Sequence, residues 1–161
     1  AAEEAAFLAG DGSGKPTGLL NMGETGVTSA AAAALTSDEL IDLYHSLRTP
    51  YRQKAVFITN DNTVKAIRKL KDGTGQYMWQ PDTLLNRPLI TSAFMPEFAA
   101  GNKVMAFGDL SYYWIADRQG RSFQRLNELF AKNGQVGFRT FQRVDGKLTL
   151  AEAVKALEMK A

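Results

Sequence analysis

Apolar residues recur at helical spacing after residue 36, where the sequence also carries the signals of a helix start. Thr36 and Glu39 have the spacing of a capping box, and Leu35 can pack against Leu40 as a hydrophobic staple. The apolar stripe consists of Leu40, Leu43, Tyr44 and Leu47. Pro50 limits the end of the segment, so the pattern predicts a helix over residues 37–48.

A second amphipathic segment follows a short apolar run. Asn60 or Asp61 can cap it, and Gly73 follows its end. Its inward positions are Val64, Ile67 and Leu70, and its outward positions are Lys65, Arg68 and Lys69. We therefore predict a second helix over residues 61–71. Residues 1–10 are typical of the last turns of another helix.

Short runs of β-branched and aromatic residues predict strands. The candidates are residues 55–58, 88–91, 103–107, 112–116 and 155–160. Residues 121–143 mix charges and aromatics without a helical period, which predicts long, partly exposed strands. Asp145-Gly146 is expected to form a hairpin turn, and residues 150–154 one helical turn. Short strands that are apolar on both faces need helices over the sheet, so the predicted fold class is α+β.

The composition is that of one ordinary folded domain of 161 residues, with 45% hydrophobic and 22% charged residues. The chain has no cysteine, which excludes a disulfide framework, a thiolate zinc site and a cysteine nucleophile. The formal net charge of +2 is too small to require a polyanion as partner. The apolar run of residues 30–35 is far shorter than the roughly 20 residues of a membrane span, so we expect a soluble protein without a membrane partner.

Residues 10–18 contain four glycines and Pro16, which predicts a loop. Within it, Gly14-Lys15 imitates the end of a phosphate-binding loop. The spacing from Gly10 to Gly14 is one residue too short for that motif, and Pro16 stands where Ser or Thr would bind magnesium. A plain connection is therefore the favoured interpretation, and a nucleotide-binding domain is the alternative.

Side chains suited to acid-base or nucleophilic chemistry are few. His45, the only histidine, lies beside the apolar stripe of the first helix, and nothing in the spacing brings it to a nucleophile with a carboxylate behind it. The adjacent carboxylates Asp38-Glu39 and Glu3-Glu4 are explained by helix capping and the helix dipole. We therefore predict no catalytic, cofactor-binding or metal-binding residues, and no enzyme activity.

Two rows of basic residues leave a nucleic-acid-binding domain open as a further alternative. They are Lys65, Arg68, Lys69 and Lys71 in the second helix, and Arg121, Arg125, Arg139 and Arg143 in the exposed strands. The aromatics interleaved with the later row are Phe123, Phe130, Phe138 and Phe141. Because no nucleic-acid-binding module surrounds them, core or interface positions and salt bridges across a subunit contact are favoured.

Four short blocks follow one another over nearly the whole chain. They are AFLAGDGSGKPTGLL at 6–20, VFITN at 56–60 with LKDGTGQY at 70–77, LLNRPL at 84–89 with Met95-Pro96, and residues 104–118. In this order the blocks resemble the major capsid proteins of tailed bacteriophages, and Gly108-Asp109 is the most specific pair. Asn86 departs from the pattern, because many relatives have glycine there, and this bears on local turn shape only.

The resemblance implies the Hong Kong 97-type fold, in which a mixed sheet flanked by helices forms an axial domain and further strands return to a peripheral domain. It implies a helix end with a glycine-rich connection at 1–19, an axial domain at 20–120, peripheral strands at 121–146, and a C-terminal strand at 147–161 that returns to the axial domain. The family's spine helix, extended loop and N-terminal arm would precede Ala1. We therefore expect this chain alone to form no closed shells.

By the same resemblance, the chain is expected to be a structural subunit of a bacteriophage or prophage icosahedral capsid that self-assembles into the shell around the genome. Its expected partners are other copies of itself, in hexameric and pentameric capsomers. Scaffold, portal or decoration proteins are further candidates, and contact with packaged DNA is expected to be indirect. The expected location is the virion, and the cytoplasm of the bacterial host before assembly.

Some shells of this family join a lysine covalently to an asparagine, with a glutamate as proton acceptor. Residues 130–133 resemble the segment that supplies the asparagine, which is Asn133 here. Seven residues on, the sequence has Thr140, whose hydroxyl cannot accept a proton near neutral pH as a carboxylate can. We therefore predict mature shells that are held without isopeptide bonds.

Overall fold

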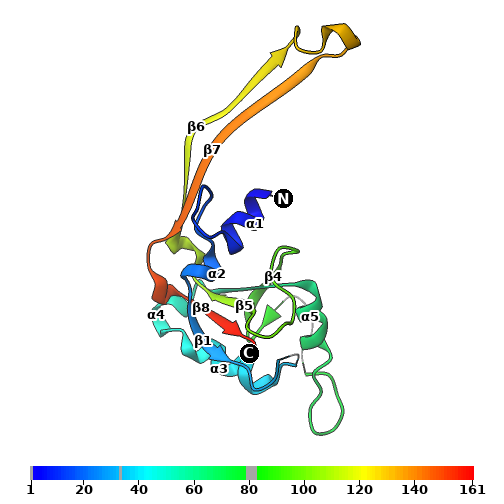
Figure 1. Cartoon of the computed structure of the whole chain (residues 1–161). Helices are drawn as coiled ribbons and strands as arrows, with labels where there is room; N and C mark the ends of the chain where they lie inside the picture. Colours follow the sequence, from blue (N-terminus) through cyan, green and yellow to red (C-terminus); the bar gives the residue numbers. More distant parts are fainter. Residues whose placement is uncertain (1, 33, 79–82) are drawn as a thin grey trace.

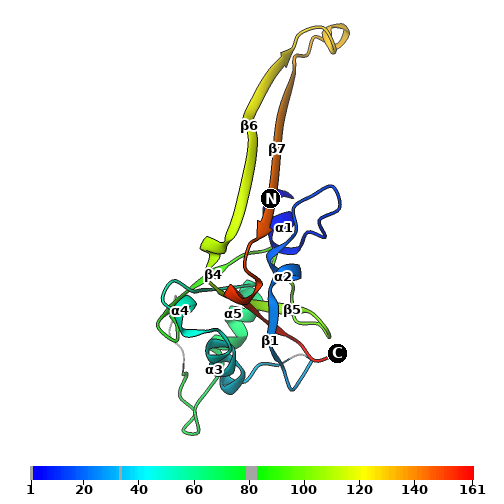
Figure 2. The same ribbon diagram turned by 90° about the vertical axis from the view of Figure 1, so that its left-hand side faces the viewer.

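The computed structural model describes residues 2–32, 34–78 and 83–161. Figure 1 shows a body built around a six-stranded sheet, from which a long two-stranded ribbon projects. In the view turned by 90° the ribbon again extends away from the body (Figure 2). In chain order the elements are α1 (Ala2–Ala9), α2 (Leu19–Met22), β1 (Glu24–Thr28), α3 (Ser37–Ser46), α4 (Thr49–Arg52), β2 (Val56–Thr59), α5 (Asp61–Arg68), β3 (Thr83–Leu84), β4 (Arg87–Thr91), β5 (Lys103–Gly108), η1 (Leu110–Tyr112), β6 (Tyr113–Leu126), η2 (Ala131–Asn133), β7 (Gly137–Leu148), η3 (Ala151–Ala153) and β8 (Val154–Glu158).

Both predicted helices are confirmed, and their first turns follow the capping signals. At α3, the Thr36 hydroxyl accepts from the backbone N–H of Glu39 at 3.3 Å, and the Glu39 carboxylate accepts from the backbone N–H of Thr36 at 2.8 Å. At α5, the Asn60 side chain accepts from the backbone N–H of Asn62 at 3.0 Å. The helix α3 ends at Ser46, earlier than predicted, because Pro50 lies in the first turn of a separate short helix, α4. The helix α5 ends at Arg68, also earlier than predicted, and Lys71 instead forms a β-bridge with Tyr77.

The body sheet is mixed, with strand order β1-β8-β5-β2-β4-β3. The pairs β1/β8 and β2/β4 are parallel, and the other three pairs are antiparallel. Each predicted strand falls on an observed one, and the predicted helical turn is η3. The α+β fold class with a mixed sheet flanked by helices is therefore confirmed.

Two hydrophobic layers cover the two faces of this sheet. One packs α3 and α5 against it and contains Leu35, Leu40, Leu43, Leu47, Ala55, Phe57, Ile67, Leu84, Val104, Met105, Phe107, Leu157 and Met159. The other packs α1 and α2 against it and contains Leu8, Leu19, Leu20, Ile58, Met95, Ala106, Leu148 and Val154. Adjacent residues point to opposite layers, as Phe57 and Ile58 show, so the central strands are apolar on both faces.

The presence of asparagine at position 86, where many relatives have glycine, has a local explanation. Leu85 and Asn86 form the two-residue turn between β3 and β4, with φ of 51° and 60°. Positive φ at both central positions is the geometry of a type I′ hairpin turn, in which asparagine is well tolerated. Asn86 thus adopts the conformation that glycine would provide.

The prediction of a hairpin turn at Asp145-Gly146 is wrong. Both residues lie inside β7, where Asp145 pairs with Ala116 and Gly146 with Ile115. The ribbon instead reverses direction over residues 127–136. Glycine inside a strand commonly marks a close approach of another group, and that is its role at Gly146.

A candidate assembly surface

The Gly108-Asp109 pair forms the junction at which the chain leaves the body sheet for the ribbon. Gly108 ends β5 opposite Val154 of β8, and a Cβ there would lie 2.4 Å from the carbonyl oxygen of Ala153. The backbone N–H of Asp109 donates to that same oxygen at 3.1 Å. The Asp109 carboxylate accepts from the backbone N–H of Ser111 at 2.9 Å and so caps η1. The pair therefore allows close strand contact and starts the turn into β6.

The base of the ribbon rests on α1 and the glycine-rich loop. The Tyr113 hydroxyl donates to the carbonyl oxygen of Thr17 at 2.8 Å, and the Tyr113 ring meets the Phe7 ring edge-on at 6.1 Å. A Cβ at Gly146 would lie 2.6 Å from the Tyr113 hydroxyl and 2.9 Å from the Phe7 ring. Gly146 thus makes room for these two aromatic rings, which hold the ribbon to α1.

Strand register divides the ribbon, residues 113–148, into two faces, because directly opposed residues point to the same side of a strand pair. Tyr113, which contacts Phe7 of α1, opposes Leu148, and Phe123 opposes Thr140 on the same side of the ribbon. What we call the apolar face carries Tyr113, Ile115, Phe123, Phe138, Val144 and Leu148, and by the same register also Asp117 and Arg125. What we call the basic face carries Trp114, Arg118, Arg139, Phe141, Arg143 and Lys147.

A bulge interrupts β6 about halfway along the ribbon. Between Arg118 and Ser122 the register shifts, so that residues 119–121 of β6 lie opposite Gln142 of β7. Gly120 has a φ of 63°, in the left-handed region that favours glycine. The Nε of Arg121 donates to the Gln142 side-chain oxygen across the bulge at 2.8 Å. Bulges increase strand twist, so this site sets how the outer ribbon is turned relative to its base.

Large apolar side chains lie exposed along the ribbon. Phe123 and Phe138 stack on each other at 5.4 Å between ring centroids, yet they remain 69% and 63% exposed. On the basic face, Trp114 is 68% exposed, and the Arg139 guanidinium lies over the Phe141 ring at 3.9 Å. Near the tip, Leu129 is 67% exposed. Exposed apolar groups gathered on one projecting element are typical of a surface that another molecule, or another segment of a longer protein, covers.

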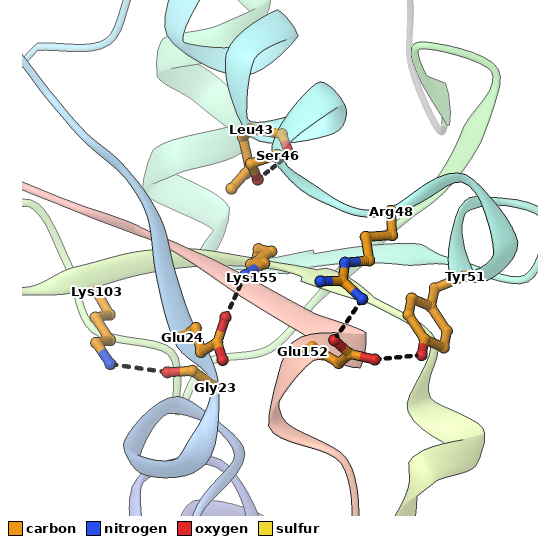
Figure 3. Close-up of polar contacts among 9 residues, drawn as sticks. All are labelled: Gly23, Glu24, Leu43, Ser46, Arg48, Tyr51, Lys103, Glu152 and Lys155. Carbon is orange, nitrogen blue, oxygen red and sulfur yellow. Dashed lines mark hydrogen bonds and ion pairs between the residues drawn. The ribbon is translucent and has the colours of Figure 1, made fainter.

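A polar cluster lies at the β1 edge of the body sheet (Figure 3). Glu24 of β1 forms an ion pair with Lys155 of β8, and this hydrogen bond with Lys155 lowers the pKa of the Glu24 carboxyl below its ordinary value. The Glu152 carboxylate pairs with Arg48 at 3.0 Å and accepts from the Tyr51 hydroxyl at 2.7 Å, which raises the pKa of Tyr51. These contacts connect α4, η3, β1 and β8, so the cluster serves the structure of the body.

The glycine-rich loop shows no features of a phosphate site. The Lys15 ammonium forms an ion pair with Asp11 at 3.3 Å, and Asp11 also accepts from the backbone N–H of Ser13 at 2.9 Å. Together these bonds, the Ser13 amide first, lower the pKa of the Asp11 carboxyl. The loop closes on itself through a bond from the Gly18 N–H to the Gly10 carbonyl oxygen at 2.8 Å. Its lysine is therefore neutralised by its own loop, which follows a helix rather than a strand.

The other candidate chemical groups are dispersed. His45 is exposed and meets the Tyr44 ring edge-on at 5.2 Å. Glu39 is used in the capping box, and Glu4 accepts from the Ser92 hydroxyl at 2.7 Å. Over residues 2–32, 34–78 and 83–161, no group of three or more His, Asp or Glu side chains could hold a metal ion. Within the same ranges, no helix is long and apolar enough to cross a membrane.

The two basic rows lie on different parts of the molecule. Lys65 and Lys69 are exposed on α5 in the body, whereas Arg121, Arg125, Arg139 and Arg143 lie on the ribbon. The four interleaved phenylalanines are all exposed, so they are surface residues of this chain and not part of its core. The sequence did not reveal the division into faces. Alternation along residues 137–148 carries that signal, but it becomes readable only once the strand register is known.

The model of the phage capsid family matches residues 1–159, and the chain belongs to that family. A chain of the "Capsid of native GTA particle computed with C5 symmetry" is 33% identical and superposes with a TM-score of 0.89. That match covers 99% of this chain and 61% of the other, so the chain spans less than two thirds of its relative. No curated protein sequence matches the chain significantly.

More distant structures share the fold. A chain of Gordonia phage Cozz is 12% identical with a TM-score of 0.67, covering 98% of this chain and 58% of that one. A chain of Mycobacterium phage Bobi is 14% identical with a TM-score of 0.68, covering 98% of this chain and 60% of that one. The fold is therefore the Hong Kong 97-type capsid fold.

Proposed function

We propose that the protein carrying this chain is a structural subunit of a phage-type icosahedral capsid and has no enzyme activity. The exposed ribbon is the observation that carries the proposal. An isolated two-stranded ribbon is marginally stable in water, and this one exposes aromatic rings such as Phe123, Phe138 and Trp114 on its two faces. Burial of these rings against other copies would stabilise an assembly without requiring a catalytic site.

The proposed partners follow from the family. Copies of the subunit would form pentameric and hexameric capsomers, and the GTA relative, whose capsid was computed with C5 symmetry, supports the five-fold arrangement. Scaffold, portal and decoration proteins are further proposed partners, and contact with packaged DNA would be indirect. We place the assembled protein in the virion, and the free subunit in the host cytoplasm.

The domain division is also a proposal. Residues 20–120 would be the axial domain, residues 121–146 the peripheral strands, and residues 147–161 the strand that returns to the axial domain. The return of β8 into the body sheet, between β1 and β5, supports the last of these assignments. As a physical unit the ribbon begins earlier, at Tyr113, where β6 leaves the body.

Substitutions on the apolar face test the proposed function. The double variant Phe123→Ser, Phe138→Ser of the intact gene product is expected to remain folded and to yield far fewer shells by sedimentation and electron microscopy. The matched control is Phe123→Tyr, Phe138→Tyr, which keeps the rings and should assemble. Shells that form equally well from the serine variant would show that the ribbon is not an assembly surface.

A further inference from the structure

Two arginines face each other directly across the ribbon. Arg118 of β6 and Arg143 of β7 are register partners on the basic face, next to the bulge. Directly opposed residues in an antiparallel pair have Cα atoms about 4.5–5.5 Å apart, so the two arginine side chains leave the ribbon side by side on one face. Like charges in this arrangement destabilise a strand pair. Both side chains are exposed, and neither forms an ion pair with any residue that the structure describes.

The surroundings supply one carboxylate against the two guanidinium charges. Asp145 is the one carboxylate that the described register places on the basic face, and it accepts from the backbone N–H of Gly146 at 2.8 Å. Arg139, farther out, lies over the Phe141 ring. The pair is therefore bordered by an aromatic ring on one side and by an engaged carboxylate on the other. An incoming anion would be the group that offsets the repulsion between the two arginines.

The charge distribution of the chain indicates where such an anion comes from. Residues 113–148 contain seven Lys or Arg and three Asp or Glu, a net charge of +4. The rest of the chain contains twelve Lys or Arg and fourteen Asp or Glu, a net charge of −2. The ribbon of one copy is thus complementary in charge to residues 1–112 and 149–161 of another copy.

We infer that Arg118 and Arg143 together bind one carboxylate side chain of a second copy of this protein. The inference rests on the proposed function, because it requires that copies assemble. Guanidinium groups bind carboxylates through paired, charge-assisted hydrogen bonds, and two of them side by side can hold both carboxylate oxygens. Such a bond removes the cross-strand repulsion at the same time. Binding of the neighbouring copy therefore also stabilises the strand pair of the ribbon next to the bulge.

A protein carboxylate fits this face better than a nucleic-acid backbone does. A phosphate chain running along the basic face would meet Asp145 two residues from Arg143, and like charges repel. The face also carries Trp114 and Phe141, whose rings suit a protein surface. A single carboxylate needs only the two opposed arginines.

The test uses the intact gene product with three double variants at residues 118 and 143. The reversal variant Arg118→Glu, Arg143→Glu is expected to lower the yield of sedimenting shells by about tenfold or more, because every subunit loses a charge-assisted contact. The neutral variant Arg118→Gln, Arg143→Gln should lower it less. The variant Arg118→Lys, Arg143→Lys, which keeps charge without the planar fork, should lower it least. The matched control Lys65→Glu, Lys69→Glu makes the same charge change on α5 and should assemble as the wild type does.

Thermal unfolding of the free subunits separates assembly from folding. The neutral variant is expected to melt no lower than the wild type, since it removes a repulsion, and it decides the test if the reversal variant fails to fold. Wild-type shells together with normal shells from the reversal and neutral variants would overturn the carboxylate site and leave the proposed function standing. Normal shells from the reversal variant, together with a salt-dependent DNA affinity that the wild-type subunit has and the variant lacks, would also overturn it, in favour of a nucleic-acid contact. A wild-type protein that stays monomeric would overturn both proposals.

Discussion

Gly108 offers a sharp test of how the ribbon is joined to the body. It is the last residue of β5 and pairs with Val154 of β8 and with Val56 of β2. A Cβ at this position would lie 2.4 Å from the Ala153 carbonyl oxygen, 2.6 Å from the Val154 Cα and 2.8 Å from its Cγ2. The first two are backbone atoms, so no change of rotamer can relieve the contact. The variant Gly108→Ala must push β8 away from β5.

Two effects of opposite sign decide the outcome. Replacing glycine by alanine restricts the unfolded chain and would stabilise the protein by about 0.4–1 kcal/mol if the methyl group fitted. Overpacking costs about 1–3 kcal/mol, and displacement of Ala153 also weakens the hydrogen bond that its carbonyl accepts from Asp109, which is worth about 1 kcal/mol. The steric cost therefore outweighs the entropic gain. We expect Gly108→Ala to lower the free energy of unfolding by about 2 kcal/mol.

Urea unfolding of the free subunit, followed by far-UV circular dichroism, measures this difference. The matched control is Gly73→Ala, because a Cβ at Gly73 would meet no atom within 4 Å and its φ is not in the left-handed region. That control should equal the wild type or exceed it by up to about 1 kcal/mol. If Gly108→Ala proves as stable as Gly73→Ala, the close approach of β5 and β8 is not the reason for glycine at this position.

Three further predictions concern the body and the ribbon tip. Glu39→Ala should lower the free energy of unfolding by about 2 kcal/mol in the same urea assay, because its carboxylate accepts from the backbone N–H groups of Ala30 and Thr36. The pKa of Glu24 is lowered by Lys155, so this ion pair contributes stability above the ordinary carboxyl pKa of 4.5 and loses it as the pH falls through the lowered value. A Glu24→Gln variant should therefore lose less stability on acidification than the wild type, and parallel pH titrations of the two would contradict this. Mature particles should run as single subunits in denaturing gels, without the covalent ladder that an isopeptide bond at Asn133 would produce.

Local signals in the sequence were sufficient for most of the body. The Thr36–Glu39 spacing determines the start of α3 through two hydrogen bonds between side chain and backbone, which depend on nothing distant in the chain. The run at residues 55–58 was a readable strand because both faces of the sheet are buried, which makes nearly every residue apolar. Its place in the sheet was not readable. The insertion of β8 between β1 and β5 depends on contacts between residues far apart in the chain.

The ribbon was predicted as strands, but its turn and its faces were not. Asp145-Gly146 has the composition of a hairpin turn, but both residues pair with β6, and the glycine leaves the space that Phe7 and Tyr113 occupy. Tertiary packing therefore outweighed a local preference. The faces escaped prediction because the bulge at residues 119–121 breaks the alternation along β6. Neither effect can be recognised without knowing which residues oppose each other.

Folding and assembly are expected to depend on different residues of this chain. The body sheet buries both of its faces within one chain, so a change such as Gly108→Ala should lower the stability of the free subunit first. The ribbon has two strands and leaves side chains such as Phe123 and Arg118 exposed, so we expect these residues to make most of their further contacts on assembly. One such contact is weak, but a closed shell repeats it in every subunit, and small losses per contact then become large losses of assembly. Body variants and ribbon variants should therefore separate when unfolding and shell yield are measured on the same proteins.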